Sequence, residues 1–458
     1  MCKLYHLWTI GCQMNEADSR HLGSQLEALG YQATNRADRA DLVVLNTCVV
    51  RQQAEDKAAS RVQSLKAVKE QRPDMTIALM GCMVGMREAP RLKKRFPFVD
   101  VFMPPSDTQP LLEYLANDEF QDASVLYETR ARAIRDAIQD EEHILPALQR
   151  GQTVVANVPI VLGCSHACTF CVIPYRRGSE RSLPRTEILR EVRTLVDQGV
   201  REVMLLGQII DRYGLDLDED VDLADLLREV ADVHGLHRIR FLTSHPNWMT
   251  NKLLDTVAEV DKICSHIEIP VQAGNNEVLQ NMRRGYTVAQ YRDLIARIRT
   301  RIPEAAINTD IIVGFPGETE AQFMDTFDLM RELRLDKQHI AKYSERPKTI
   351  AARQMPDTVG ADEKERRRKL LDDLQSEILT EKNARLKGQT VQILVEDTQR
   401  GRWRGRTTDN RLVFFEHDCD FRGQLVDVHV DWTGPYSLIG SWQGVKPSMS
   451  TRSPAATV

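Results

Sequence analysis

Short apolar runs alternate with amphipathic segments along most of the chain. The first three runs are "KLYHLWTIGC", "DLVVLNTC" and "TIALMGC", each of the length of one buried strand. A helical spacing of apolar positions covers Glu16 to Leu29 between the first two runs, and an amphipathic helix reaching about Glu70 follows the second. Nearly continuous apolar strands separated by helices are typical of parallel sheets covered on both faces. The pattern therefore predicts an α/β domain with a parallel sheet over residues 1–116.

A cysteine stands at the end of each of these three runs: Cys12, Cys48 and Cys82. In an open parallel sheet the carboxyl ends of the strands share one edge, where ligands bind. We therefore expect three thiols that are far apart in the sequence to meet at one point. The pattern alone leaves a second interpretation open, because buried cysteine is also a common small hydrophobic residue at a strand end.

A second series of strands and helices begins at "NVPIVLGC" and continues through "EVMLLGQ", "RIRFLTS", "SHIEIPVQAG" and "INTDIIVGFPGE". Repeated β–α units over roughly 220 residues favour a complete or partial (β/α) barrel, which we assign to residues 157–386. A highly charged helix from about Glu363 to Leu386 is expected to be a solvated linker leading away from it. The charged stretch 117–156 is interpreted as a connector with some helix.

From Gln389 the pattern changes to short β segments separated by turns, from "TVQILVED" to "YSLIGSW". Five such segments predict a small β-barrel over residues 387–445. The tail 446–458 is poor in large apolar residues and is expected to be disordered. The fold class is thus α/β, with an N-terminal parallel-sheet domain, a central (β/α) barrel and a C-terminal β-barrel.

Composition narrows the possible function classes. A length of 458 residues suits about three domains, and no apolar run is long enough to cross a membrane. The start "MCKLYHLWTIGCQMN" does not resemble a secretory signal, so we expect a cytoplasmic protein without a membrane partner. Nine cysteines in such a compartment favour metal binding or catalysis over disulfides. The net charge of −5 excludes a uniformly basic surface but leaves a local RNA-binding patch open.

Cys164, Cys168 and Cys171 lie within eight residues, in "GCSHACTFC". Cysteine thiolates hold iron–sulfur clusters, and three of them on a four-iron cube leave one iron free to bind a small molecule. A zinc site completed by His166 is the rival interpretation, although zinc sites more often use paired C-x₂-C arms. A set of buried structural thiols is a further alternative, which the crowding of the three cysteines disfavours.

The C-x₃-C-x-aromatic-C spacing after a strand resembles the radical S-adenosylmethionine (SAM) superfamily. The resemblance implies that Cys164, Cys168 and Cys171 hold a 4Fe-4S cluster whose open iron binds SAM, with Phe170 as the aromatic residue of the motif. "GCQMNEADS", "LNTCVVRQQAEDKA" and "MGC" are similar to the N-terminal domain of methylthiotransferases, in which the three cysteines hold an auxiliary 4Fe-4S cluster. "GRWRGRTTDNRLVFFE" resembles the RNA-binding TRAM domain. Within the family, the motifs look most like the MiaB type.

The resemblance also implies an activity. Methylthiotransferases of this type use SAM and two 4Fe-4S clusters to add a methylthio group to carbon 2 of an isopentenyl-modified adenosine, 3′ of the tRNA anticodon. They need an electron donor, such as flavodoxin or ferredoxin, and a sulfur donor. One alternative is the same chemistry on another tRNA adenosine or on an aspartate of a ribosomal protein. A more distant alternative is a non-catalytic iron–sulfur protein that binds RNA.

Three further positions are candidates for binding SAM or the substrate. Gln208 and Gln272 end predicted strands at the presumed site, although polar residues also finish strands without any function. "GFPGE" at Gly314 lacks the lysine and the full glycine pattern of a phosphate-binding loop, so a tight strand-to-helix turn is expected there. The family resemblance implies that backbone near this strand contacts the SAM adenine.

An arginine-rich hairpin in the C-terminal barrel is the candidate RNA surface. Arginines can contact phosphates while an aromatic ring stacks on a base, and a solubilising charged hairpin is the alternative. The residues concerned are Arg400, Arg402, Trp403, Arg404, Arg406 and Arg411. Four positions near the presumed pocket depart from the usual MiaB pattern and bear on the choice of substrate: Ile209, Asp211, Glu268 and Lys348.

Overall fold

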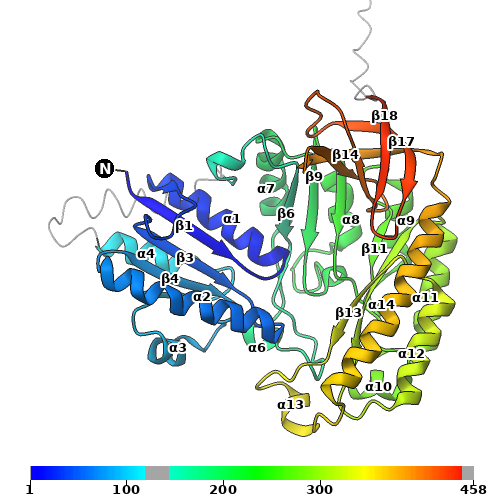
Figure 1. Ribbon diagram of the computed structural model, residues 1–458, viewed down its shortest axis with the longest axis horizontal. Helices are drawn as coiled ribbons and strands as arrows, with labels where there is room; N and C mark the ends of the chain where they lie inside the picture. Colours follow the sequence, from blue (N-terminus) through cyan, green and yellow to red (C-terminus); the bar gives the residue numbers. More distant parts are fainter. Residues whose placement is uncertain (1, 119–143, 446–458) are drawn as a thin grey trace, which may run out of the picture.

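The computed structural model describes residues 2–118 and 144–445. Figure 1 shows three parts: an N-terminal sheet with helices on both faces, a central set of parallel strands, and a C-terminal barrel. Most of the predicted connector, and the predicted disordered tail, lie outside the described residues. Within residues 2–118 and 144–445, no helix combines the length and the apolar character needed to cross a membrane.

The N-terminal sheet is parallel and has the strand order β2-β1-β3-β4-β5, which confirms the predicted α/β class. Successive residues of β3 alternate between two cores, because neighbouring side chains of a strand point to opposite faces. The strands are β1 (Leu4–Thr9), β2 (Gln32–Ala33), β3 (Leu42–Thr47), β4 (Thr76–Gly81) and β5 (Val101–Met103). The helices are α1 (Gln13–Ala28), α2 (Gln52–Gln71), α3 (Ala89–Arg95) and α4 (Gln109–Asp118).

The central domain is a partial barrel of two three-stranded parallel sheets. An isolated bridge joins Ile239 of β10 to Ile263, three residues before β11. The strands are β6 (Val155–Pro159), β9 (Glu202–Leu206), β10 (Arg238–Phe241), β11 (His266–Glu268), β12 (Ala306–Val313) and β13 (Lys337–Lys342). A short hairpin of β7 (Val161–Leu162) and β8 (Arg181–Ser182) follows β6. The repeated β–α units were thus predicted correctly, and the barrel is partial.

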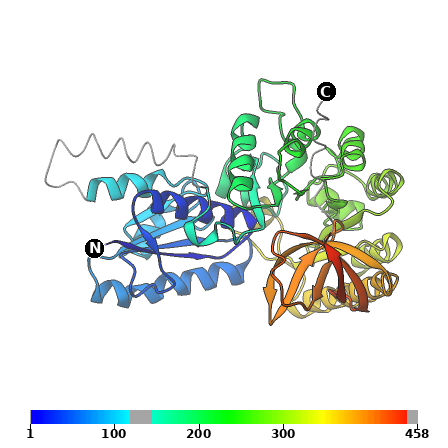
Figure 2. The ribbon, with the colours of Figure 1, turned by 90° about the horizontal axis from the view of Figure 1, so that it is seen from above.

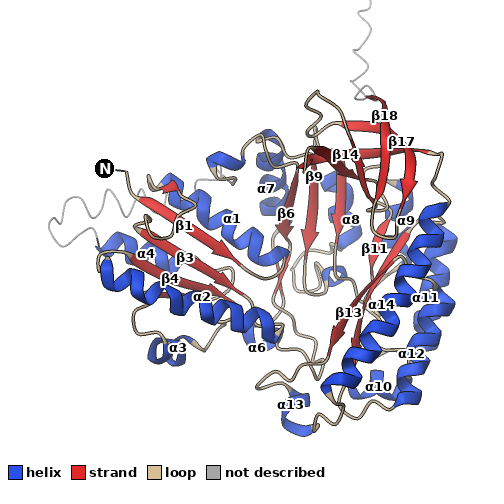
Figure 3. Ribbon diagram, in the orientation of Figure 1, coloured by secondary structure: helices blue, strands red, loops and turns tan. Residues whose placement is uncertain are grey.

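Helices cover the outer face of these strands (Figure 3). Four of them begin at side chains that accept a backbone hydrogen bond from the first turn, namely Asp222, Thr250, Thr287 and Thr319. They are α8 (Leu223–Ala231), α9 (Asn251–Glu259), α11 (Val288–Arg301) and α12 (Glu320–Leu333), and α7 (Arg185–Asp197) precedes them. Shorter helices are α6 (Ile173–Arg177), α10 (Asn276–Asn281) and α13 (Ile350–Gln354), with 3-10 turns at Ala147–Gln149 and Ile210–Arg212.

The charged helix α14 (Ala361–Ala384) packs along β13 instead of leading away from the domain. Leu371 and Ile378 are buried in the central core. Arg367 is buried as well, and it donates to the Glu318 carboxylate at 2.8 Å. The expectation of a solvated linker was therefore wrong. Helix α14 has a narrow apolar stripe, and many of its charges pair with one another. Its highly charged overall composition hides this stripe in the sequence.

The C-terminal domain is a closed five-stranded barrel, as predicted, with the strand order β14-β15-β16-β18-β17. Its strands are β14 (Thr390–Gln399), β15 (Arg402–Arg406), β16 (Leu412–Phe415), β17 (Leu425–Thr433) and β18 (Leu438–Val445). Figure 2 shows it packed against the central domain and clear of the N-terminal sheet. Arg240 on β10 is one of the polar contacts between them, because its guanidinium donates to the carbonyls of Thr407 and Thr408 at 2.6 and 2.8 Å.

Arg240→Ala is expected to destabilise the chain by about 3 kcal/mol. Arg240 is fully buried and pairs at 2.7 Å with the buried Glu202 carboxylate, so its removal leaves an uncompensated charge and two unpaired carbonyls. Urea unfolding measures the loss. The matched control is Arg402→Ala, since Arg402 forms an exposed pair with Glu416 and its loss should cost less than about 1 kcal/mol. Equal losses of unfolding free energy in both variants would contradict the role of Arg240 as a buried contact between the two domains.

Candidate metal centre

Cys12, Cys48 and Cys82 meet at the carboxyl edge of the N-terminal sheet. Strands β1, β3 and β4 are direct neighbours, and Cys48 and Cys82 follow β3 and β4 immediately. Cys12 lies just before α1, three residues beyond β1. The three thiols are close enough to influence one another electrostatically. The expected convergence of three distant cysteines is therefore present in the structure.

A glycine before Cys12 permits this convergence. Gly11 has a φ of 143°, and a Cβ at this position would lie 3.0 Å from the Cβ of Cys48 and 2.7 Å from Nδ2 of Asn15. Asn15 Nδ2 donates to the carbonyls of Ile10 and Thr47, both at 3.0 Å. This one side chain thus joins the loops that carry Cys12 and Cys48. A larger residue at position 11 would push them apart.

Cys164, Cys168 and Cys171 lie on the loop between β7 and α6. Gly163 begins this loop with a φ of 68°, and a Cβ there would lie 2.1 Å from the carbonyl oxygen of Ser179. Thr169 fixes the middle of the loop, because its backbone N–H donates to the Met282 carbonyl at 3.1 Å and its hydroxyl to the Asn281 carbonyl at 2.9 Å. The three thiols influence one another electrostatically, so they are grouped as the motif predicts.

Phe170, the aromatic residue of the motif, packs against the central core. This contact holds the loop of the second cysteine trio on the barrel. Backbone N–H groups also donate to sulfur in both trios, from Val50 to Cys48 and from His166 to Cys164, each at 3.4 Å. Such donors favour thiolates over thiols.

Each trio also has a buried arginine beside it. Arg284 donates to Cys168 Sγ at 3.1 Å. Arg177 lies beside the N-terminal trio and lowers the pKa of Cys82, against the larger effect of burial, which raises that pKa to about 11. Burial likewise raises the pKa of Cys164 to about 11 and that of Cys171 to about 12. Because soft thiolates with cationic neighbours suit iron–sulfur clusters, both trios fit such a group, and its binding would release thiol protons.

The zinc alternative requires His166 as a fourth ligand beside the three thiols. The His166 ring lies against His245 and Trp248, with centroid distances of 4.9 and 5.7 Å. Across residues 2–118 and 144–445, no three cysteine, histidine or carboxylate side chains are placed to share one metal ion. The thiolates of an iron–sulfur cluster bind different irons and stand farther apart than the ligands of one zinc ion.

The three predicted SAM-contacting positions lie at the same carboxyl end of the central strands. Gln208 follows β9 and is half-buried. Gln272 has a φ of 70°, and its backbone bonds to Asp310 and Ile312 of β12 at 2.9 and 3.0 Å. Gly314 directly follows β12, and its N–H donates to the Glu318 carboxylate at 2.6 Å. Their placement agrees with the prediction, while their contacts with SAM stay a prediction.

Four positions depart from the usual MiaB pattern, and three of them lie in or near the central barrel. Ile209 is buried beside Cys164. Asp211 accepts from the backbone N–H of His245 at 2.9 Å, and burial raises its pKa to about 7. Burial, followed by the nearby Asp310, also raises the pKa of Glu268 to about 7. The fourth position ties the domains together, because the Lys348 ammonium pairs with Glu88 of the N-terminal domain.

Trp403 is not a surface residue, so the expectation that it stacks on RNA was wrong. It is only 8% exposed within the C-terminal barrel core, and its Nε1–H donates to the His417 carbonyl at 3.1 Å. The neighbouring Arg400 lies in a turn with a φ of 53°. The other four predicted arginines have carboxylate partners: Arg402 with Glu416, Arg404 with Asp397, Arg406 with Glu396, and Arg411 with Asp409.

Exposed aromatic residues lie elsewhere on this barrel. Trp432, Tyr436 and Trp442 are 50%, 63% and 37% exposed. Alternation along β17 buries Val428 and Val430, and a register shift between Val430 and Trp432 then leaves Trp432 outside. An irregularity of this kind has no signal in the apolar pattern, which is why sequence reasoning missed this surface.

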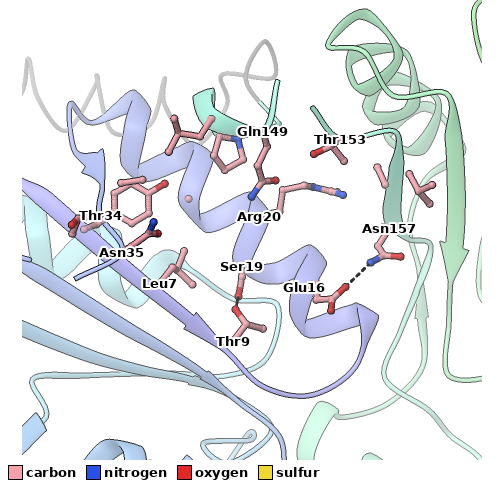
Figure 4. Close-up of a pocket in the computed structure, with 17 residues that line it drawn as sticks. Leu7, Thr9, Glu16, Ser19, Arg20, Thr34, Asn35, Gln149, Thr153 and Asn157 are labelled. Carbon is pink, nitrogen blue, oxygen red and sulfur yellow. Dashed lines mark hydrogen bonds between the residues drawn. The ribbon is translucent and has the colours of Figure 1, made fainter. Parts of the chain in front are cut away.

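A cavity of about 460 Å³ lies on the flank of α1, between β1 and β6 (Figure 4). None of the cysteines lines it, so it is separate from the metal centre. Polar contacts join the domains along this cavity. Glu16 accepts from Asn157 at 3.2 Å, and the buried Arg20 pairs with Glu191 at 2.8 Å. The cavity therefore belongs to the seam between the N-terminal and central domains.

Comparisons with known proteins agree with this architecture. Residues 158–330 match the radical SAM superfamily, residues 4–104 match the uncharacterized protein family UPF0004, and residues 384–442 match the TRAM domain. Among solved structures, the radical S-adenosylmethionine methyltransferase TsrM from Kitasatospora setae, with cobalamin and a 4Fe-4S cluster bound, is similar at a TM-score of 0.50. It shares 15% identity over 77% of this chain and 74% of its own, so the likeness concerns the fold alone.

Similarity to named relatives extends over nearly the whole chain. The tRNA-2-methylthio-N(6)-dimethylallyladenosine synthase of Chloroflexus aurantiacus is 46% identical over 95% of this chain and 91% of its own length. The synthases with the same name from Roseiflexus sp. and Dehalococcoides mccartyi are each 45% identical over 95% of this chain, and over 89% and 97% of their own lengths. The chain therefore belongs to the family of tRNA-2-methylthio-N(6)-dimethylallyladenosine synthases within the radical SAM superfamily.

Proposed function

We propose that this protein adds a methylthio group to carbon 2 of the dimethylallyl-modified (isopentenyl-modified) adenosine 3′ of the tRNA anticodon. The observation that carries the proposal is the pair of cysteine trios, one at the carboxyl ends of three parallel strands and one on the loop after β7, each beside a buried arginine. One such trio is expected of any radical SAM enzyme. The second, built from three separate strands, is what a sulfur-inserting enzyme requires. Relatives that carry the synthase name support the same conclusion.

The six cysteines divide the work between two sites. Cys164, Cys168 and Cys171 would hold the 4Fe-4S cluster that binds SAM, and the other trio, Cys12, Cys48 and Cys82, would hold the auxiliary 4Fe-4S cluster. When bound, these groups supply one-electron reduction of SAM and the sulfur that is transferred. Arg284 compensates thiolate charge at Cys168. Thr169 and Phe170 anchor the loop that carries Cys164, Cys168 and Cys171, which fixes the position of SAM relative to the barrel.

Substrate contacts are proposed on the same rim. Gln208, Gln272 and the backbone at Gly314 face SAM or the base at the carboxyl ends of the strands. The target base lies in a single-stranded loop, so no duplex has to be opened to reach it. The C-terminal barrel is proposed to contact the RNA, since it matches the TRAM domain. Its exposed Trp432 and Tyr436 can stack on bases, and Arg400 can contact phosphate.

Further partners follow from the chemistry. Reduction of SAM needs an electron donor such as flavodoxin or ferredoxin, and repeated turnover needs a sulfur donor that restores the auxiliary site. We place the reaction in the cytoplasm, where the tRNA substrate is found.

Expression in a bacterial strain that lacks its own methylthiotransferase tests the proposal. Mass spectrometry of tRNA nucleosides is expected to show 2-methylthio-N6-dimethylallyladenosine, with loss of the unthiolated precursor. In a strain that also lacks the dimethylallyl group, the product should be absent. A methylthio group on another adenosine, or on a ribosomal-protein aspartate, would move the activity to that target. Accumulation of the unthiolated precursor, with an intact and reduced protein, would overturn the proposed function.

A further inference from the structure

Helix α6 connects the two cysteine trios directly. It begins two residues after Cys171 and ends at Arg177, within a segment of the central domain. Yet the Arg177 side chain extends into the N-terminal domain. Its guanidinium donates to Asn15 Oδ1 at 2.8 Å and to the Ser106 hydroxyl at 3.3 Å, and it lies 3.6 Å from the Asp18 carboxylate. A residue of the SAM-binding segment is thus built into the edge of the other domain.

Arg177 is deeply buried, at 8% exposure, and it lies beside the N-terminal cysteines. The Asn15 Oδ1 that accepts from its guanidinium at 2.8 Å also accepts from Cys12 Sγ at 3.8 Å. Its charge acts on Cys82, Cys12 and Cys48, the three cysteines of the N-terminal trio. Among the described residues, its Nε–H has no oxygen or nitrogen partner. Burying a guanidinium costs several kcal/mol unless anions compensate its charge, and Asp18 is the only carboxylate paired with it in the described part of the chain. At least the Nε–H of Arg177 is therefore available to an anionic group held by the three thiolates.

We infer that Arg177 is a positioning residue of the auxiliary iron–sulfur site, supplied by the radical SAM domain to complete a site whose ligands all belong to the N-terminal domain. The inference rests on the proposed function, since it takes the N-terminal trio to hold a cluster. Net charge and hydrogen bonds to sulfur set the reduction potential of iron–sulfur clusters. A buried cation beside the cluster stabilises its more negative, reduced state. It also opposes loss of the thiolate ligands.

Arg176, the preceding residue of the same helix, provides a matched control. Its side chain lies 3.9 Å from Glu88 and packs on Gly85, so it bridges the same two domains through different partners. A merely structural role of the helix in joining the domains would make Arg176 and Arg177 comparable. If Arg177 acts on the auxiliary site, only its substitution should change the properties of the cluster.

The test uses the full chain carrying Cys164→Ala, Cys168→Ala and Cys171→Ala, so that only the auxiliary site can bind iron. In this parent, Arg177→Met is expected to lower the midpoint potential of the cluster. The potential is measured by a redox titration monitored with electron paramagnetic resonance. Arg177→Met is also expected to speed iron loss to a chelator by about tenfold, the change that a 1.4 kcal/mol loss of stabilisation gives. Arg177→Lys should restore part of the potential, and Arg176→Gln should leave both measurements at the parent values.

The outcomes separate the two proposals. A parent that binds no iron would overturn the proposed function, because the auxiliary cluster itself would be missing. A parent with about four iron atoms, in which Arg177→Met and Arg176→Gln behave alike, would overturn only the role of Arg177. Should Arg177→Met fail to fold, Ser106→Ala replaces it, since it keeps the guanidinium and removes a hydroxyl that bonds both to it and to Asp18. A smaller change in the same direction is then expected, and unchanged potential and iron loss would overturn the inference.

Discussion

The Cys164→Ala/Cys168→Ala/Cys171→Ala variant is expected to lose all reductive cleavage of SAM while it keeps about four of eight iron atoms. These three thiols lie on one loop beside Arg284, and the N-terminal trio has its own loops and its own arginine, Arg177. The two sites should therefore lose iron independently. Iron and sulfide are counted after anaerobic purification, and 5′-deoxyadenosine is measured with dithionite as reductant. Formation of the methylthio nucleoside should fall to background.

Two cysteines outside the trios control for the loss of a thiol. Cys264 is buried in the central domain and Cys419 is exposed in the C-terminal barrel. Cys264→Ala and Cys419→Ala are expected to keep about eight iron atoms and full SAM cleavage. A trio variant that retains eight iron atoms, or that still produces 5′-deoxyadenosine, would contradict the assignment of the SAM site.

The convergence of the N-terminal cysteines was predictable because it depends on topology. Apolar runs that end in cysteine and alternate with helices place the ends of β1, β3 and β4 on one edge, whatever the details of packing. The C-terminal barrel was predictable for a similar reason, because five short segments with turns between them have one common closed arrangement. In both cases short-range patterns determine the outcome.

Side chains that act across the domain seam could not be predicted in this way. Arg177 follows the SAM motif in the sequence, and only the relative placement of two domains brings it to Cys82. Within the central domain, Arg284 likewise reaches Cys168 across 116 residues. Neither position has a periodicity or a spacing that distinguishes it from other arginines. Long-range ion pairs depend on packing, which the apolar pattern does not encode.

The incorrect prediction for Trp403 has a different cause, because the sequence pattern itself indicates that this residue is buried. In "RWRGR" the arginines alternate with other residues, so Arg402, Arg404 and Arg406 share one face of β15 and Trp403 points to the other. In a small closed barrel that other face is the core. Applying the same alternation to the tryptophan would have buried it, and the exposed rings are instead Trp432 and Tyr436.

The Cys12→Ala/Cys48→Ala/Cys82→Ala variant is expected to give the reverse result of the first triple variant. It should lose about four iron atoms and all methylthio transfer, yet still cleave SAM to 5′-deoxyadenosine. The physical reason is that the SAM-binding loop is held by its own contacts, from Thr169 to α10 and from Phe170 to the central core.

The same assays, iron counting, 5′-deoxyadenosine release and nucleoside mass spectrometry, measure this variant. Circular dichroism confirms that it is folded. Loss of both cleavage and transfer in a folded protein would mean that the trios form one functional unit. Retention of methylthio transfer would show that sulfur comes from elsewhere. Only cleavage without transfer, paired with the opposite pattern of iron loss in the first variant, assigns sulfur insertion to the carboxyl edge of the N-terminal sheet.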